Sequence, residues 1–516
     1  MFCGVGRVVD EDRSCVLCGK LTPVRSRCGA PRHGDCRPGG GGAAPTSPQR
    51  PPDGSSRLSP PETLVQRPRG GGARARTTPR RGVHLYGVLD HDALIVVADR
   101  RPGPSEPLDE AYPSRLAGCV DLARRHDLEA LWVHDSALGR LGLRTDPDEV
   151  PVGMTGWEVY GRGEPDQVEL AVPAWFTGST RWAEAESGRK LAGALAAYEA
   201  ALGMRFRAAP AATALALLGM LHKRAGARQL IAPTVLPPRE VCASERDLSW
   251  CRSLTETEQA ARYVIGLDKH GAYPGVMKSL TLGMGDPQHH PEGRYDPQLP
   301  GRHRVIEVIP APDRDELLPD PMTGVMRDGQ WRCTETLRYA AEQGVRFTVA
   351  ESYVWPDSAK PLAMFAERVR TGRADLTARA EDDPAAALAL GALKETYAAL
   401  GGALASRTTG DRETPGALWR PDWTATVIAK ARVNILRNLD KSGARPFAAN
   451  VDEVFFAVGS EDPANIGLPL GGSFGQYDDK KNPAVPLAEV ADAVAEATRR
   501  GRPSPLLQAL RAAREP

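Results

Sequence analysis

The chain has 516 residues and a formal net charge of +1 at pH 7. It is long enough for two or three domains, and it is neither strongly acidic nor strongly basic as a whole. No run of about 18 or more apolar residues appears, and the most apolar stretch, residues 208–221, has the length of a buried core helix. No basic-then-apolar signal pattern opens the sequence. We therefore expect a soluble, cytoplasmic protein without a membrane partner.

Five of the nine cysteines fall in the first 36 residues. Two Cys-x2-Cys-like pairs, separated by fourteen residues, offer four soft ligands for a tetrahedral zinc ion. The candidate ligands are Cys15, Cys18, His33 and Cys36. Residues 1–37 cannot bury a core, so the metal would supply their folding energy. Cys28 competes with His33 as a ligand, and the alternative is a segment with incidental thiols.

Residues 38–82 are rich in Gly, Pro, Ser and Arg and have no apolar period, which is typical of a disordered linker. Residues 37–82 contain nine Arg against Asp53 and Glu62. Such a basic segment could lie along a nucleic-acid backbone and gain from released counterions. The alternative is a solvated linker without a partner.

Residues 83–250 alternate between strand-like and helical patterns, which indicates an α/β layer of the RNase-H or exonuclease type, with a degenerate site. The expected strands are 83–89, 93–98, 130–133 and 168–176, and the expected helices are 108–126, 184–202 and 208–224. Asp90, Asp92, Asp99 and Asp135 lie near strand ends. They could be nuclease ligands, but turn formers are favoured.

Two carboxylates in residues 251–485 follow apolar runs. The run from Val264 to Leu267 predicts a buried strand that delivers Asp268 to its end, with Gly and Pro following. Residues 447–457 predict a hairpin with Asp452 at its turn. A lone Asp after a strand is usually a cap or a turn former. Two carboxylates on neighbouring strands could, however, share the divalent cations that phosphoryl transfer requires.

The other elements of this half follow from their periodicity. We expect strands at 304–309, 347–355 and 471–477, a loop at 287–300, and helices at 331–343, 362–370, 385–405 and 423–439. Helix 385–405 carries Lys394, and helix 423–439 carries Lys430, Arg432 and Arg437 toward one side. Residues 486–516 close the chain as helices.

Three motifs in this order resemble the palm of family B DNA polymerases. Asp268-x2-Gly-Ala-Tyr273-Pro274 is similar to their first motif, Asp-x2-Ser-Leu-Tyr-Pro. Lys394-x3-Ala-Ala-Leu-Gly-Gly402 is similar to the second, Lys-x3-Asn-Ser-x-Tyr-Gly, and keeps its Lys and last Gly. Asn450-Val-Asp452-Glu stands where those enzymes have Asp-Thr-Asp-Ser, so the first Asp has become Asn450.

A closer resemblance covers roughly residues 85–485. It is to the telomere-associated protein of linear bacterial chromosomes and plasmids, a family found in actinobacteria. The segments that carry it are 263–275, 295–301, 419–422, 431–434 and 470–474. This resemblance implies binding to telomeric DNA and recruitment of the terminal protein that primes end replication. Members usually begin with a helix-turn-helix, whereas a zinc knuckle and a basic linker are expected here.

The polymerase resemblance implies roles for particular residues. Asp268 and Asp452 would bind two divalent ions, Mg²⁺ or Mn²⁺, about 4 Å apart, one activating a primer hydroxyl and the other holding a triphosphate. Lys394 would meet the phosphates, and Tyr273 would pack under the sugar. Arg432 and Lys430 would contact nucleotide or backbone. The alternative is a retired palm that binds without turnover: the missing first Asp argues for impairment, and the retained Asp268, Asp452 and Lys394 argue against complete loss.

The sequence therefore predicts an α+β protein: a polymerase-like palm of antiparallel sheet with helices, preceded by the α/β layer and the zinc module. The expected function is that of a DNA-binding replication protein associated with the nucleoid, with a terminal protein as a second partner. Two alternatives stay in view. One is an active metal-dependent DNA polymerase or nucleotidyltransferase, and the other is a zinc-containing DNA-binding regulator with an uninvolved body.

Overall fold

The computed structural model describes most of the chain after residue 84. The described ranges are 13–14, 21–22, 85–108, 113–144, 156–162, 166–176, 181–224, 235–242, 245, 247–322, 330–406, 418–478 and 483–514. Two compact units, Met1–Thr78 and Pro79–Pro516, divide the chain. In the first, strands β1 (Arg13–Ser14) and β2 (Leu21–Thr22) pair antiparallel. The expected zinc ligands and the expected linker lie outside the described residues.

The second unit begins with a six-stranded mixed sheet in the order β5-β4-β3-β6-β8-β7. Its strands are β3 (Tyr86–Leu89), β4 (Ala93–Ala98), β5 (Arg101–Pro107), β6 (Ala130–Val133), β7 (Trp157–Tyr160) and β8 (Val168–Ala171). The pairs β3–β6 and β6–β8 are parallel, and the others are antiparallel. This is the α/β layer that the sequence predicts, with β5 and β7 as strands that were not expected.

Both faces of this sheet are buried, because its central strands are apolar at every position. Tyr86, Val88 and Trp132 pack toward helix α3 (Gly188–Leu202), whereas Leu89 and Val133 pack toward α1 (Leu116–Arg125). The helix expected at 108–126 begins eight residues later than predicted, at Leu116. Short helices α2 (Asp135–Leu138), η3 (Pro173–Trp175) and η4 (Arg181–Glu184) complete the layer.

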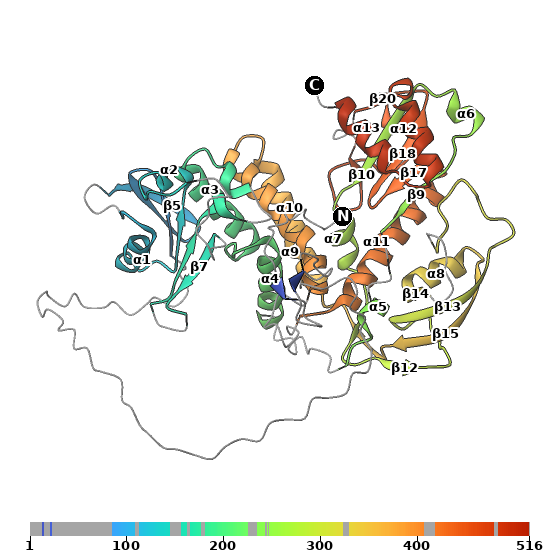
Figure 1. Cartoon of the computed structure of the whole chain (residues 1–516), viewed down its shortest axis with the longest axis horizontal. Coiled ribbons are helices and arrows are strands. Elements are labelled where there is room, and N and C mark those ends of the chain that lie inside the picture. Colours follow the sequence, from blue (N-terminus) through green and yellow to red (C-terminus); the bar gives the residue numbers. More distant parts are fainter. Residues whose placement is uncertain are drawn as a thin grey trace, which may run out of the picture. The chain divides into compact units, whose positions relative to one another are not determined.

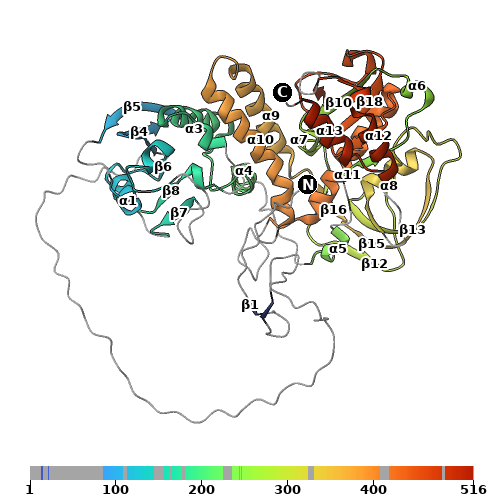
Figure 2. The same ribbon diagram turned by 45° about the horizontal axis from the view of Figure 1, so that its top comes forward.

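Four helices form one apolar bundle against this layer: α3, α4 (Pro210–Arg224), α9 (Ala363–Arg379) and α10 (Pro384–Ala405). Figures 1 and 2 show α9 and α10 beside α3 and α4, although they are far apart in the sequence. The Tyr198 and Thr396 hydroxyls are 2.8 Å apart in the interior, and His222 Nε2 is 2.7 Å from the Pro361 carbonyl oxygen. The expected segments 83–250 and 251–485 thus share a core.

A second sheet is antiparallel and has the order β19-β10-β18-β17-β9, with β20 also paired to β10. Its strands are β9 (Ser249–Cys251), β10 (Tyr263–Lys269), β17 (Ala448–Asn450), β18 (Glu453–Val458), β19 (Tyr477–Asp478) and β20 (Val485–Pro486). The antiparallel sheet with helices matches the expectation for this half. The expected strand 471–477 is wrong, because only Tyr477 and Asp478 pair in the sheet.

Helices cover both faces of this antiparallel sheet. On one face, Leu267 and Phe456 pack against Leu439 of α11 (Pro421–Ser442). On the other, Val264 and Phe455 contribute to a cluster with α12 (Leu487–Arg500) and α13 (Ser504–Arg514), and Figure 2 shows these two helices over β10 and β18. The alternation of side chains along each strand assigns one set of apolar residues to each face.

A third, four-stranded antiparallel sheet is inserted between β10 and α9, in the order β12-β15-β13-β14. Its strands are β12 (Gln288–His290), β13 (Gly301–Ile309), β14 (Gln330–Cys333) and β15 (Arg346–Val354). The expected helix 331–343 is a strand up to Cys333 and only then helix α8 (Thr334–Glu342). Likewise, His289 and His290 lie in a strand and not in a loop.

The remaining elements are short. They are α5 (Arg239–Cys242), α6 (Glu256–Gln259), α7 (Ala272–Met277), η6 (Pro463–Ile466) and the strand pair β11 (Leu282–Met284) with β16 (Asp357–Ala359). Over the ranges given above, no helix combines the length and the apolar content needed to cross a membrane.

The inserted sheet is joined to α11 through Glu245, a buried carboxylate. Its Oε2 accepts a hydrogen bond of 2.8 Å from the Cys333 backbone N–H and lies 3.4 Å from Arg302 Nη1. Its Oε1 accepts from the Thr336 hydroxyl at 2.9 Å and pairs with Arg432 Nη2. Burial would raise the pKa of Glu245, but the charges of Arg432 and Arg302 outweigh it and lower the pKa to about 2.

We expect Glu245→Ala to lower the free energy of unfolding by about 3–5 kcal/mol, because it leaves the buried guanidinium groups of Arg302 and Arg432 without their counter-charge. The measurement is urea unfolding at pH 7. Glu342→Ala is the matched control, since Glu342 is 45% exposed and pairs with Arg437 at the surface, where such pairs contribute about 0–1 kcal/mol.

A pH series sharpens this test. A carboxyl whose pKa is lowered by folding stabilises the folded state above its unfolded value, here 4.5, and this contribution is lost as the pH falls toward about 2. The difference between wild type and Glu245→Ala should therefore shrink between about pH 4.5 and 2. Equal losses for Glu245→Ala and Glu342→Ala would contradict this account.

Candidate functional site

Asp268 stands near the end of β10, flanked by carboxylates on both neighbouring strands. Its Cα partners are Glu453 on β18 and Asp478 on β19. The run from Val264 to Leu267 is buried, which fixes the strand and leaves Asp268 half-buried at its end. The prediction of a strand that delivers Asp268 to its end is therefore confirmed.

Asp452 lies in the turn between β17 and β18, as the hairpin pattern predicts. The Lys269 N–H donates to the Asp452 carbonyl oxygen at 3.0 Å, so the turn lies against the end of β10. Val451, the residue before it, has a φ of +58°, which is unusual for a β-branched residue. Its N–H donates to the Leu248 carbonyl oxygen at 2.6 Å, and this bond helps to hold the turn. Asp268 and Asp452 thus share one end of the sheet.

Charged side chains surround His270 at this end of the sheet. Its Nε2 is 3.3 Å from Asp478 Oδ2, and its Nδ1 is 3.4 Å from Arg373 Nη2 of α9. Burial lowers the pKa of His270, and the positive charges of Arg373 and Lys394 lower it further, against Asp478 and Asp268. Lys394 and Asp268 therefore both lie within electrostatic reach of one imidazole.

Tyr397 lies one helical turn after Lys394 on α10. Burial raises the pKa of Tyr397, and the charges of Asp268 and Asp452 raise it further. The sequence interpretation overlooked Tyr397 and His270. Two signals were present: Tyr397 follows Lys394 at i+3, a spacing that shares a helix face, and His270 follows Asp268 by two residues.

Tyr273 is the second residue of α7. The helix begins directly after Gly271, which has a φ of +52°. Its hydroxyl donates to Asp247 Oδ1. Burial raises the pKa of Tyr273, and the nearby carboxylates of Asp247 and Asp452 raise it further. The tyrosine therefore lies close to the Asp452 side of the site, with its hydroxyl held by Asp247.

Lys269 is a buried cation beside Asp452 that the sequence interpretation did not single out. Its side chain is on the α11 side of the sheet, where its Nζ lies 5.3 Å from the centre of the Tyr477 ring. Burial lowers its pKa to about 8, against the attraction of Asp452. Lys269 also lines a cavity of about 160 Å³ with Asn434 and Asn438.

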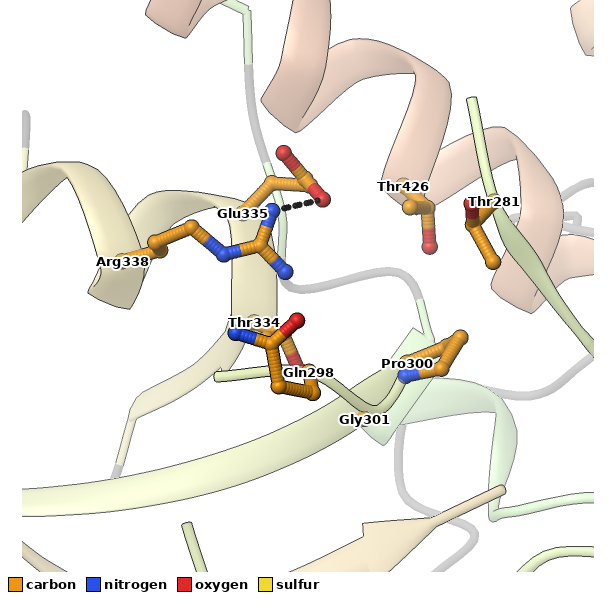
Figure 3. Close-up of a pocket in the computed structure, with 8 residues that line it drawn as sticks. All are labelled: Thr281, Gln298, Pro300, Gly301, Thr334, Glu335, Arg338 and Thr426. Carbon is orange, nitrogen blue, oxygen red and sulfur yellow. Dashed lines mark hydrogen bonds and ion pairs between the residues drawn. The ribbon is translucent and has the colours of Figure 1, made fainter. Parts of the chain in front are cut away.

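Arg432 and Lys430 are not brought to the two carboxylates. Arg432 is 3% exposed and pairs with Glu245, as described above. Lys430 pairs with Glu335 at 2.9 Å. Glu335 and Arg338 line the small polar pocket of Figure 3, which has a volume of about 20 Å³, enough for about one water molecule. Arg432 and Lys430 of α11 therefore help to hold the inserted sheet and α8 to α11 through these two ion pairs.

Asp90, one of the carboxylates of the α/β layer, makes its hydrogen bonds within that layer. Asp90 accepts hydrogen bonds from the Ser136 hydroxyl and from the Gly188 N–H at the start of α3, the latter at 2.9 Å. Among the residues that the structure describes, no group of three or more His, Cys, Asp or Glu side chains is arranged to hold a metal ion. Asp268 and Asp452, which share one end of the sheet, are the residues that could hold Mg²⁺, since this ion is commonly held by one or two carboxylates with water and substrate phosphates.

Comparisons with known proteins find likeness only among solved structures. No family model and no curated protein matches the chain. Phi29 DNA polymerase with primer-template DNA and incoming nucleotide is 12% identical, with a TM-score of 0.46 over 78% of this chain and 85% of that one. The same polymerase with single-stranded DNA is 13% identical, with a TM-score of 0.44 over 77% and 83%.

The family B DNA polymerase of the archaeon Pyrobaculum calidifontis is 15% identical, with a TM-score of 0.27 over 72% of this chain and 52% of that one. All these TM-scores are below 0.5 and all identities are below 25%. The interpretation of the site therefore rests on its own geometry.

We expect Tyr273→Phe to lower the free energy of unfolding by about 1–3 kcal/mol, because the Asp247 carboxylate loses a hydrogen-bond donor in a partly buried setting. Urea unfolding measures the change. Tyr160→Phe, on the edge strand β7 of the other sheet, removes the same atom and should cost less. A Tyr273→Phe chain as stable as the wild type would show that this hydrogen bond does not stabilise the site.

Proposed function

We propose that the chain is a DNA-binding replication protein with a family B polymerase-like palm. One observation carries the proposal: Asp268 of β10 and Asp452 of the β17–β18 turn share one end of an antiparallel sheet, and both act on Tyr397 of the helix that carries Lys394. A pair of carboxylates with a cation on a facing helix is suited to phosphate chemistry, in which metal ions and Lys offset negative charge.

In this proposal Asp268 and Asp452 hold Mg²⁺ or Mn²⁺, which offsets charge on phosphate oxygens when bound. Lys394 is exposed on α10 and meets the phosphates as a point charge. Tyr273 packs under the sugar, and its hydroxyl bond to Asp247 fixes the ring for that role. We leave Arg432 out of the nucleotide site, because its guanidinium is buried in the pair with Glu245.

We infer that the palm works chiefly as a binding platform. Asn450 replaces the first carboxylate of the hairpin motif, and the buried Lys269 ammonium already attracts Asp452. The second candidate is an active DNA polymerase or nucleotidyltransferase. The retention of Asp268, Asp452 and Lys394 around one imidazole and one tyrosine favours it.

The finer parts of the proposal come from the resemblance of residues 85–485. They are telomeric DNA of linear replicons as the target, a terminal protein as the partner, and action at the nucleoid in the cytoplasm. The zinc module of residues 1–37 and the basic linker of residues 38–82 would then supply DNA contacts outside the palm. A zinc-containing DNA-binding regulator with an uninvolved body is the third candidate, supported by the nine Arg of residues 37–82.

Primer extension with labelled dNTP and Mg²⁺ or Mn²⁺, combined with DNA binding by the same samples, tests the proposal. We expect the wild type and the Asp268→Ala, Asp452→Ala double variant both to bind DNA, because backbone contacts carry most of the affinity. Incorporation that vanishes only in the double variant would assign nucleotidyl transfer to the two carboxylates. No incorporation by the wild type, with DNA binding intact, would assign the platform role.

The control is Asp92→Ala, at the exposed β3–β4 turn of the other sheet, which should match the wild type in both assays. A wild-type chain that binds neither duplex nor single-stranded DNA at low salt would overturn the proposed function. DNA binding carried wholly by a fragment of residues 1–82 would favour the regulator instead.

Zinc content tests the N-terminal proposal separately. We expect the purified chain to carry about one zinc ion, held by four ligands, and Cys15→Ser with Cys18→Ser to lose it by elemental analysis. Cys3→Ser is the control and should keep the metal. Comparing Cys28→Ser with His33→Ala decides which of these two residues completes the site, and a wild-type chain without zinc would contradict the module.

A further inference from the structure

A pocket of about 550 Å³ lies between helix α9 and the loop that precedes β19. Its polar lining consists of Arg370, Arg373 and Thr377 of α9 and Ser473 of the loop, with Phe474 as the aromatic wall. None of its lining residues is acidic. The volume falls within the range of about 300–1,000 Å³ that is common for pockets binding small organic groups.

The sequence of α9 explains why this space is open and polar. Arg370, Arg373, Ala374, Thr377 and Ala378 recur at intervals of three and four residues and so share one face of the helix. Small side chains on that face, and Gly472 across from it, leave room. The opposite face, with Phe365, Val369 and Leu376, is buried in the apolar bundle. The helix is therefore held rigidly while its cationic and hydroxyl face lines the pocket.

Arg373 is fixed within this wall. It is 9% exposed, its Nη1 donates to the Gly472 carbonyl oxygen at 2.7 Å, and its guanidinium lies 5.1 Å from the centre of the Phe474 ring. Its Nε has no hydrogen-bond partner in the structure. A guanidinium carries five N–H donors, and a rigid one loses little entropy when it binds an oxyanion.

The local charge favours an anion. Near Arg370, the carboxylate of Glu367 is shared with Lys278, at 2.9 Å from Lys278 Nζ. Arg370 and Lys278 thus share one carboxylate, and Arg373 adds a further positive charge to the pocket lining. The hydroxyls of Thr377 and Ser473 add donors that an oxyanion can accept.

The pocket lies near Asp268. Arg373 Nη2 is 3.4 Å from His270 Nδ1, and His270 follows Asp268 by two residues. A nucleic-acid strand that reaches Asp268 therefore has its next phosphates within reach of α9. Phe474 already packs against Arg373 and Tyr397, with ring centres of the two aromatics 5.5 Å apart, so we expect phosphate contact and not base stacking.

We propose that this pocket binds a phosphodiester group of a single strand of DNA, through Arg370, Arg373, Thr377 and Ser473. The inference rests on the proposed function and adds to it a second contact site on α9. Because phosphates carry no base identity, the pocket would hold the strand with little sequence preference. Single-strand binding in a positively charged groove is a common arrangement in replication proteins.

The test is fluorescence anisotropy of the full chain with a labelled oligo-dT, over a range of salt concentrations. Two variants address the pocket: Arg370→Ala removes an exposed cation, and Ala378→Trp fills space from an exposed helix position. The control is Arg379→Ala on the same helix, which pairs with Asp383 at 2.9 Å and does not line the pocket. All three changes are at exposed positions and should leave the fold intact.

We expect Arg370→Ala and Ala378→Trp each to weaken binding by about 3–10-fold, with Arg379→Ala within about twofold of the wild type. The slope of log K against log salt should fall by about 0.7 for Arg370→Ala, the value for one phosphate contact on a single strand. An unchanged slope and affinity in both pocket variants, with wild-type binding intact, would overturn the inference and leave the proposed function standing.

A competition arm separates the two sources of phosphate. Free dNTP that displaces the oligonucleotide from the wild type, together with loss of dNTP binding but not of oligonucleotide binding in Ala378→Trp, would assign the pocket to free nucleotide and overturn the inference. A wild type that binds no DNA at all would overturn the proposed function itself, which is a different result from either of these.

Discussion

A single buried carboxylate, Glu245, ties together segments that lie up to 187 residues apart in the sequence. It bonds the end of β14, the first turn of α8 and the middle of α11. Since α11 also covers one face of the antiparallel sheet that carries Asp268, Glu245 helps to position the inserted sheet, together with the Lys430–Glu335 pair. Such a network stabilises only when complete, because each charge left behind would be buried without a partner.

Local patterns were sufficient to predict the elements that carry the site. The branched apolar run before Asp268 and the paired runs around Asp452 specify strands through a period of two, and the hairpin turn then brings the two residues to one sheet end. The helix around Lys394 was equally clear. Prediction failed where a short strand runs directly into a helix, as at Cys333, because no turn residue separates the two periods.

Side-chain roles were harder to predict than elements. The polymerase resemblance placed Arg432 at a nucleotide, yet neither the resemblance nor the helical spacing of the charges tells which side of the helix is buried. Its partner, Glu245, is 187 residues away and outside any local window. Conversely, Lys269 and His270 directly follow Asp268 and were not predicted, although Lys269 interacts electrostatically with Asp452, and His270 with Asp478 and Asp268. The polymerase motif includes Asp268 and Tyr273 but assigns no role to the two residues that directly follow Asp268.

The apolar bundle of α3, α4, α9 and α10 has a consequence for how this chain can evolve. Helix α10, which carries Lys394 and Tyr397, packs against α3 and α4. The α/β layer and its helices therefore support α10. Deleting that layer would expose the apolar surface of α10 to solvent and leave the helix without a fixed orientation. The α/β layer is therefore needed to fix α10 whether or not it carries any chemistry of its own.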